Sequence, residues 1–104
     1  MAIDRIASFR ALIAKAPQDP FPRYGLAMEF RSRGELEAAA AAFDELIAAF
    51  PDYVPSYLMA GGVAGKLGRP DTARSLFQRG IEVATARGDS HARGELQSAL
   101  AEVA

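Results

Sequence analysis

The sequence of this chain repeats itself with a period of 34 residues. Phe9, Phe43 and Phe77 are separated by 34 positions each. Further residues recur in the same register: Ile13, Ile47 and Ile81; Pro17 and Pro51; Gly34 and Gly68; Ala39 and Ala73. A fixed period of about 20–50 residues is the signature of a repeat architecture, so the chain is expected to be built from copies of one supersecondary unit.

Each unit is expected to contain two α-helices. Apolar residues recur at helical spacing, in stretches that end at Pro17, Gly34, Pro51, Gly68 and Gly88. Alanine, which has the highest helix propensity, is abundant, whereas the β-branched residues that favour strands are sparse. Six such stretches with short connections predict an all-α array of antiparallel helix hairpins with about six helices.

The pattern inside the repeats resembles the tetratricopeptide repeat (TPR) family, whose units carry Trp-x2-Leu-Gly-x2-Tyr, a turn glycine, Ala-x3-Phe and a closing proline. The first unit matches at Leu26, Ala27, Phe30, Gly34, Ala39, Phe43 and Pro51. The second unit matches at Tyr57, Gly61, Gly68, Ala73 and Phe77. Arg23 and Thr85 depart from the tryptophan and proline positions. The resemblance implies a right-handed α-solenoid.

A chain of 104 residues is expected to form a single domain. It divides into a half-repeat, two full repeats and a second half-repeat: residues 1–18, 20–53, 54–87 and 89–104. The last segment is expected to be a capping helix, which repeat arrays need for solubility. Its apolar stripe of Leu96, Leu100 and Val103 should cover the helix before it.

The composition argues against several functions. The sequence has no cysteine, which excludes disulfides, thiolate catalysis and zinc fingers. A formal net charge of −1 argues against nucleic acid as a partner, and no apolar run approaches the ~20 residues of a membrane span. Asp4 and Arg5 stand where a signal peptide would be apolar, so a cytoplasmic location is expected.

Two features of the charged residues leave alternatives open. His91, the only histidine, has Glu95 four residues later, which suits either a metal or general-base pair or an ordinary exposed first turn. Ten arginines against two lysines suit either a phosphate-binding face or a compositional bias. No second ligand or nucleophile set accompanies His91, and the acidic residues balance the basic ones. We therefore expect no enzymatic activity, no metal, no cofactor and no nucleic acid partner.

Glycines cluster at Gly61, Gly62 and Gly65, inside a predicted helix. Gly61 falls on the close-packing position of the TPR pattern. Gly62 and Gly65 fall on no such position of the pattern. They still call for an explanation, because a glycine inside a helix costs about 1 kcal/mol relative to alanine. They reflect either a solvated face under weak selection or a backbone that something approaches closely.

In TPR proteins, the first helix of each pair lines a concave groove that binds peptides. Carried over to this sequence, the resemblance implies a largely apolar groove lined by Phe21, Tyr24, Met28, Arg31, Leu58, Gly62, Gly65, Lys66 and Leu96. Tyr24, Met28 and Leu58 are expected to lie side by side, and Arg31 and Lys66 to orient the ligand.

The function implied is non-catalytic binding of a peptide or helical segment of a protein partner. The alternative is a structural or assembly protein that homodimerises through the groove or through an end of the array.

Overall fold

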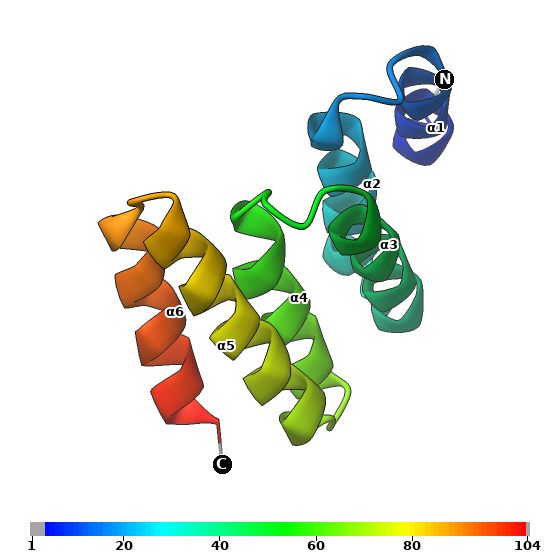
Figure 1. Ribbon diagram of the computed structural model, residues 1–104. Coiled ribbons are helices and arrows are strands. Elements are labelled where there is room, and N and C mark those ends of the chain that lie inside the picture. Colours follow the sequence, from blue (N-terminus) through cyan, green and yellow to red (C-terminus); the bar gives the residue numbers. More distant parts are fainter. Residues whose placement is uncertain (1–3, 104) are drawn as a thin grey trace.

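Six α-helices make up the computed structural model, which describes residues 4–103. The helices are α1 (Arg5–Lys15), α2 (Pro20–Ser32), α3 (Leu36–Ala49), α4 (Pro55–Lys66), α5 (Pro70–Ala86) and α6 (Ser90–Glu102). Successive helices run antiparallel (Figure 1), and residues 4–103 contain no strand, so the predicted all-α array is confirmed. Ile3, which begins the first apolar stretch, lies outside the described residues.

Local sequence signals fix the ends of these helices. Carboxylates of Asp4, Asp19 and Asp89 accept backbone N–H bonds at the starts of α1, α2 and α6, over 3.2, 3.0 and 3.0 Å. A proline occupies the first position of α2, α4 and α5, where its missing N–H costs nothing. Gly34, Gly68 and Gly88 follow α2, α4 and α5 with φ of 77°, 73° and 70°, a conformation that favours glycine.

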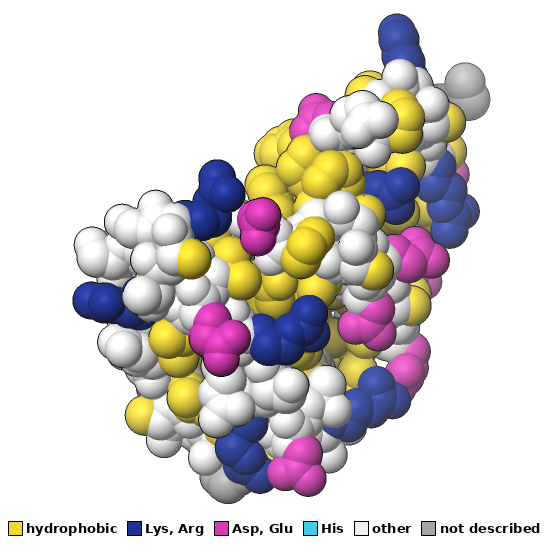
Figure 2. All heavy atoms as spheres, in the orientation of Figure 1, with side chains coloured by type: hydrophobic (Ala, Val, Ile, Leu, Met, Phe, Trp, Pro, Cys, Tyr) yellow, Lys and Arg dark blue, Asp and Glu magenta, His cyan; other side chains and the backbone are white. Residues whose placement is uncertain are grey.

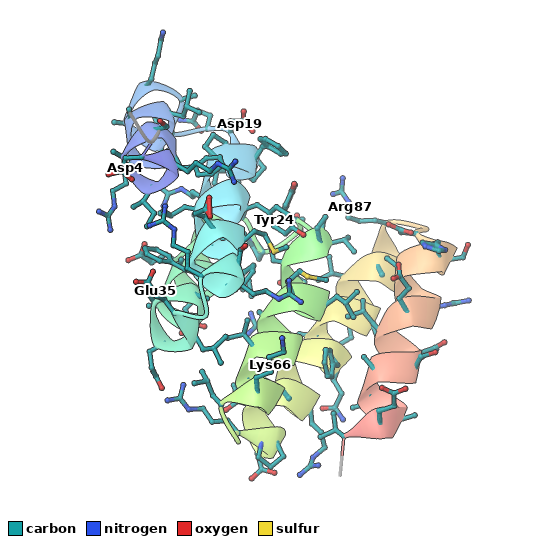
Figure 3. All side chains as sticks on the ribbon, turned by 180° about the vertical axis from the view of Figure 1, so that it is seen from behind. Asp4, Asp19, Tyr24, Glu35, Lys66 and Arg87 are labelled. Atoms are coloured by element: carbon teal, nitrogen blue, oxygen red, sulfur yellow. The ribbon has the colours of Figure 1, made fainter. Side chains whose placement is uncertain are left out.

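The helices form two layers. α2, α4 and α6 lie on one face, which we call the groove face, and α3 and α5 lie behind them (Figures 1 and 3). α3 packs between α2 and α4, and α5 packs between α4 and α6. α1 packs on α2 at one end of the array, and α6 lies at the other end. The groove face is therefore built from the first helix of each successive pair.

A single apolar core fills the space between the layers. Phe43, Leu46, Tyr57, Phe77 and Leu96 are all buried in it. The Tyr57 hydroxyl donates a hydrogen bond to the Pro51 carbonyl oxygen over 2.5 Å, and the Arg79 guanidinium lies 5.6 Å from the centre of its ring. Tyr57 thus joins α4 to the loop before it and to α5.

Three glycines allow the helices to approach closely. The Phe77 ring of α5 lies against Gly61 of α4, and the Phe9 ring of α1 lies against Gly25 of α2, so a Cβ atom at either glycine would overlap the ring. A Cβ atom at Gly80 would lie 2.6 Å from Cβ of Tyr57. The TPR pattern indicated the contact at Gly61 but not those at Gly25 and Gly80.

The two ends of the array differ in how deeply they are packed. α1 has no buried residue, and its contact with α2 is supplemented by an ion pair from Arg5 to Glu29 at 3.5 Å. In α6, Leu96 is 1% exposed, and Leu100 and Val103 are partly buried against the core. The C-terminal end therefore contributes far more to the core than the N-terminal end does.

Removing residues 89–104 is expected to destabilise the chain severely. Leu96 loses its full burial and Leu100 and Val103 lose part of theirs, which together cost about 3–6 kcal/mol. That loss is comparable with the ~5–15 kcal/mol stability of a whole domain. We expect an insoluble product or one without a cooperative thermal transition by circular dichroism. A soluble truncated chain with an unchanged melting temperature would contradict the capping role of α6.

Substituting alanine at Gly61 and at its neighbour Gly62 is expected to change stability in opposite directions. At Gly61 the new methyl group meets the buried Phe77 ring, so overpacking should cost about 1–3 kcal/mol. At Gly62 nothing lies within 4 Å of the new methyl group, so the higher helix propensity of alanine should stabilise by up to about 1 kcal/mol. Urea unfolding of both variants measures the difference, and equal effects would contradict the packing described.

Candidate functional site

A hollow of about 330 Å³ opens on the groove face between the N-terminal halves of α4 and α6. We call it the α4–α6 hollow. Its lining residues come from α2, from the start of α4 and from the start of α6: Tyr24, Val54, Pro55, Leu58, Met59, Asp89, His91, Ala92, Glu95 and Leu96. In Figure 3, which views this face, the side chain of Tyr24 extends from α2 toward α4.

The inner part of the α4–α6 hollow is apolar. Leu96 is buried beneath it, and Leu58 and Met59 are half-buried in its wall. Tyr24 is held by edge-to-face contacts with Phe43 and Tyr53, at ring-centre distances of 6.3 and 5.8 Å. The hollow therefore presents fixed apolar surface to the solvent.

Burial raises the pKa of two tyrosines near this face. Desolvation raises the pKa of Tyr24 above its usual value of 10.0; the neighbouring Tyr53 adds to the effect and Arg31 opposes it. Desolvation also raises the pKa of Tyr57, against the effect of Arg79. Both hydroxyl groups are therefore neutral at physiological pH, and Tyr24 can donate a hydrogen bond to a ligand.

The outer part of the α4–α6 hollow is acidic. Asp89 caps α6 by accepting the N–H of Ala92, and Glu95 Oε1 lies 3.0 Å from His91 Nε2. His91 is 89% exposed at its side chain, in agreement with an ordinary first-turn residue. Among the described residues, no lysine or arginine lines this hollow. Arg87 stands on the preceding turn and points away from the helices (Figure 3).

A second hollow, of about 300 Å³, lies between the C-terminal half of α4, the start of α5 and the end of α6. Its lining residues are Gly61, Gly62, Gly65, Pro70, Ala73, Phe77, Ala99, Glu102 and Val103. Nothing in the chain lies within 4 Å of a Cβ atom placed at Gly62 or Gly65. No part of residues 4–103 therefore packs on the exposed backbone at these two glycines.

A third hollow, of about 530 Å³, separates α1 from α2. Arg5, Phe9, Gly25, Met28, Glu29, Arg31 and Ser32 line it. Residues at positions 25, 28, 29 and 32 form the face of α2 that meets α1. Met28 and Arg31 thus lie at the border between this hollow and the groove face.

Of the nine residues predicted to line one groove, seven are distributed over three hollows. Tyr24, Leu58 and Leu96 lie together in the α4–α6 hollow. Gly62 and Gly65 line the second hollow, and Met28 and Arg31 line the third. Phe21 is exposed, and neither it nor Lys66 lines any of these three hollows.

The acidic lining was not predicted from the sequence. The sequence does contain one relevant pattern. Asp89 and Glu95 each lie three positions from Ala92, and Leu96 lies four positions after it, so all four share one side of α6. The apolar stripe of α6 is obvious, whereas charged residues beside such a stripe are usually solvated. Only the position of α4 shows that these charges border a hollow.

Metal binding and membrane insertion find no support in the described part of the chain. Within residues 4–103, no three histidine or acidic side chains converge on a point where they could share a metal ion. None of the described helices combines the length and the apolar character needed to cross a membrane.

Comparison with known proteins identifies relatives by structure. No protein-family model matches the chain, and neither does any curated protein. The solution structure of a tetratricopeptide repeat domain protein from Salinibacter ruber is 39% identical, with a TM-score of 0.79 over 84% of this chain and 88% of that chain. A crystal structure of a tetratricopeptide repeat domain protein from the same organism is also 39% identical, with a TM-score of 0.78 over 82% of this chain and 96% of that one.

The same fold occurs at lower sequence identity. The solution structure of a protein from Bordetella parapertussis is 20% identical and has a TM-score of 0.82 over 98% of this chain and 89% of its own, which shows a shared fold. The two Salinibacter ruber structures show family membership as well as a shared fold, because their 39% sequence identity extends over most of both chains. This chain therefore belongs to the tetratricopeptide repeat family, whose helix pairs form protein-interaction modules.

Proposed function

We propose that this chain binds a segment of a partner protein in the α4–α6 hollow, without catalysing a reaction. The observation that carries the proposal is an apolar hollow of about 330 Å³, open to solvent, on the face built from first helices. Its volume lies at the lower end of the ~300–1,000 Å³ typical of ligand pockets, which suits a bulky side chain of a peptide. Exposed apolar surface of this kind commonly marks an interaction site.

The side chains around the hollow favour tight contact with such a segment. Tyr24 is oriented by Phe43 and Tyr53, so it offers a large contact area at a small cost in conformational entropy. Met59 can adapt its shape to an irregular ligand. Burying one partner leucine here contributes about 1.5–3 kcal/mol before the entropy cost of association, so further contacts along the peptide must add to it.

The absence of catalysis and the cytoplasmic location belong to the same proposal. His91 and Glu95 form a solvent-exposed pair, which favours a role at the edge of a binding surface over a catalytic one. The cysteine-free composition is compatible with the cytoplasm.

Leu58→Glu is expected to abolish binding while leaving the helical circular dichroism unchanged. Leu58 is half-buried in the wall of the hollow, so the substitution removes apolar contact surface and places there a carboxylate that would lose water when the apolar side chain of the ligand binds. The probe is a library of random twelve-residue peptides displayed on phage and selected on the immobilised wild-type chain. Enriched peptides are then synthesised and titrated by calorimetry.

Gln97→Glu serves as the control for added charge, because Gln97 is an exposed residue of α6 that does not line the hollow. It should bind the enriched peptides as the wild type does. If Leu58→Glu also binds them normally, the binding site lies elsewhere on the chain.

A homodimer through an array end is the second candidate, and exposed apolar side chains favour it. Among the described residues, the large hydrophobic side chains left exposed are Leu12 at 48% and Phe21 at 62%, both near the N-terminal end of the array. If they form an interface, the mass in solution should double with rising concentration, and Leu12→Ser with Phe21→Ser should restore the monomer. A wild-type monomer at high concentration removes this candidate.

A further inference from the structure

We infer that the ligand of the α4–α6 hollow is a peptide that carries a bulky apolar side chain close to an arginine or lysine. The inference rests on the proposed function and adds the charge of the ligand to it. The sequence predicts that Arg31 and Lys66 orient the ligand, whereas this inference assigns that role to Asp89 and Glu95.

Neither of those two cations lines the α4–α6 hollow, although Arg31 lies near enough to Tyr24 to lower the pKa of its hydroxyl group. Arg31 lines the hollow between α1 and α2, where Arg5 also lies. Lys66 is at the C-terminal end of α4, whereas the α4–α6 hollow lies at the N-terminal end of that helix (Figure 3). The titratable lining side chains other than Tyr24 are two carboxylic acids, Asp89 and Glu95, and His91. Although the chain has 12 lysines and arginines, none of those described lines this apolar surface.

Both carboxylates retain capacity for a ligand. A carboxylate offers about four acceptor positions, and the Asp89 cap uses one oxygen for the Ala92 N–H. Glu95 is half-exposed, and its contact with His91 is a surface pair, which contributes little to stability and exchanges readily. A guanidinium group could therefore form charge-assisted hydrogen bonds with either residue.

The spacing of the two carboxylates fits a short extended segment. Glu95 is six positions after Asp89, which corresponds to a rise of about 9 Å along a helix. An extended peptide covers that distance with about three residues. A basic residue within about three positions of the apolar anchor could therefore reach one carboxylate while the anchor occupies the hollow.

The helix dipoles at this hollow favour a negatively charged ligand, but their effect is weaker than that of the two carboxylates. The N-termini of α4 and α6 both lie at the hollow, and each carries about half a positive charge. Asp89 already satisfies an N–H group of α6. The carboxylates of Asp89 and Glu95 outweigh these partial charges. Arg93 lies beside Asp89 but lines a separate small hollow with Ser90, so the side chains that line the α4–α6 hollow itself favour a cation.

The test uses a double variant that removes charge and preserves shape. Asn is as good an N-cap as Asp, so Asp89→Asn keeps the start of α6, and Glu95→Gln keeps a partner for His91. Asp44→Asn with Glu82→Gln is the matched control. It makes the same change in net charge at exposed positions of α3 and α5, which lie behind the groove face.

The peptides enriched from the random library should combine an aliphatic or aromatic residue with a nearby arginine or lysine. Their dissociation constants should rise about threefold to tenfold on the Asp89→Asn, Glu95→Gln chain and stay unchanged on the control. A peptide whose basic residue is replaced by glutamine should bind both chains equally. In about 1 M salt the difference between the two chains should disappear while binding persists, since salt screens charges and leaves apolar contact intact.

The outcomes separate the inference from the proposed function. Peptides that depend on Leu58 but carry acidic or uncharged flanks, or bind the double variant as tightly as the wild type, overturn the inference alone. A library that yields no enriched peptide, or only peptides that ignore Leu58→Glu, overturns the binding site and the inference with it.

Discussion

The contact between a phenylalanine ring and a glycine backbone determines the spacing of the helices in this chain. Phe77 presses on Gly61 between α4 and α5, and Phe9 presses on Gly25 between α1 and α2. An α-helix with side chains is about 10 Å across, and without a Cβ atom at the contact the axes can come closer. The third ring of the 34-residue series, Phe43, has no glycine partner of this kind, because Ala27 occupies the position of α2 that corresponds to Gly61 of α4.

The α4–α6 hollow depends on a second contact of this kind. Gly80 of α5 leaves room for Tyr57 of α4 on one side and for Leu96 of α6 on the other, with the added Cβ position only 3.0 Å from a Leu96 methyl group. Leu96 is thereby held under the hollow, and Asp89 and Glu95 on the same helix are brought to its border. The residue that anchors the capping helix to the core also positions the charges of the candidate site, so stability and recognition share α6.

The sequence was enough to predict the helices but only part of the site. The signals at Asp19, Pro55, Gly34 and Gly68 act within one turn of the chain, so they can be interpreted without the fold. The grouping of site residues depends on which neighbour each helix face meets. Met28, which was expected beside Leu58, also lines the hollow between α1 and α2, because α2 has a neighbour on each side and Gly25 allows α1 to approach that turn closely. The sequence does not show that Asp89 and Glu95 line a hollow, because the hollow exists only where α4 lies beside α6.

The formal net charge of −1 averages over basic and acidic residues that are mixed along the array, with Arg87 and Arg93 close in sequence to Asp89 and Glu95. Arg5, Arg31 and Arg33 gather around α1 and the end of α2, with Glu29 paired to two of them. Asp89 and Glu95 gather at the far end, beside exposed apolar surface. Figure 2, which shows the opposite face, has basic and acidic side chains interspersed. Exposed charges interact appreciably only within about 10 Å at ordinary ionic strength, whereas the array extends 43 Å. A ligand in the α4–α6 hollow is therefore expected to respond to the charges nearest to it: Asp89 and Glu95 in the lining, and Arg31, which acts on the hydroxyl group of Tyr24.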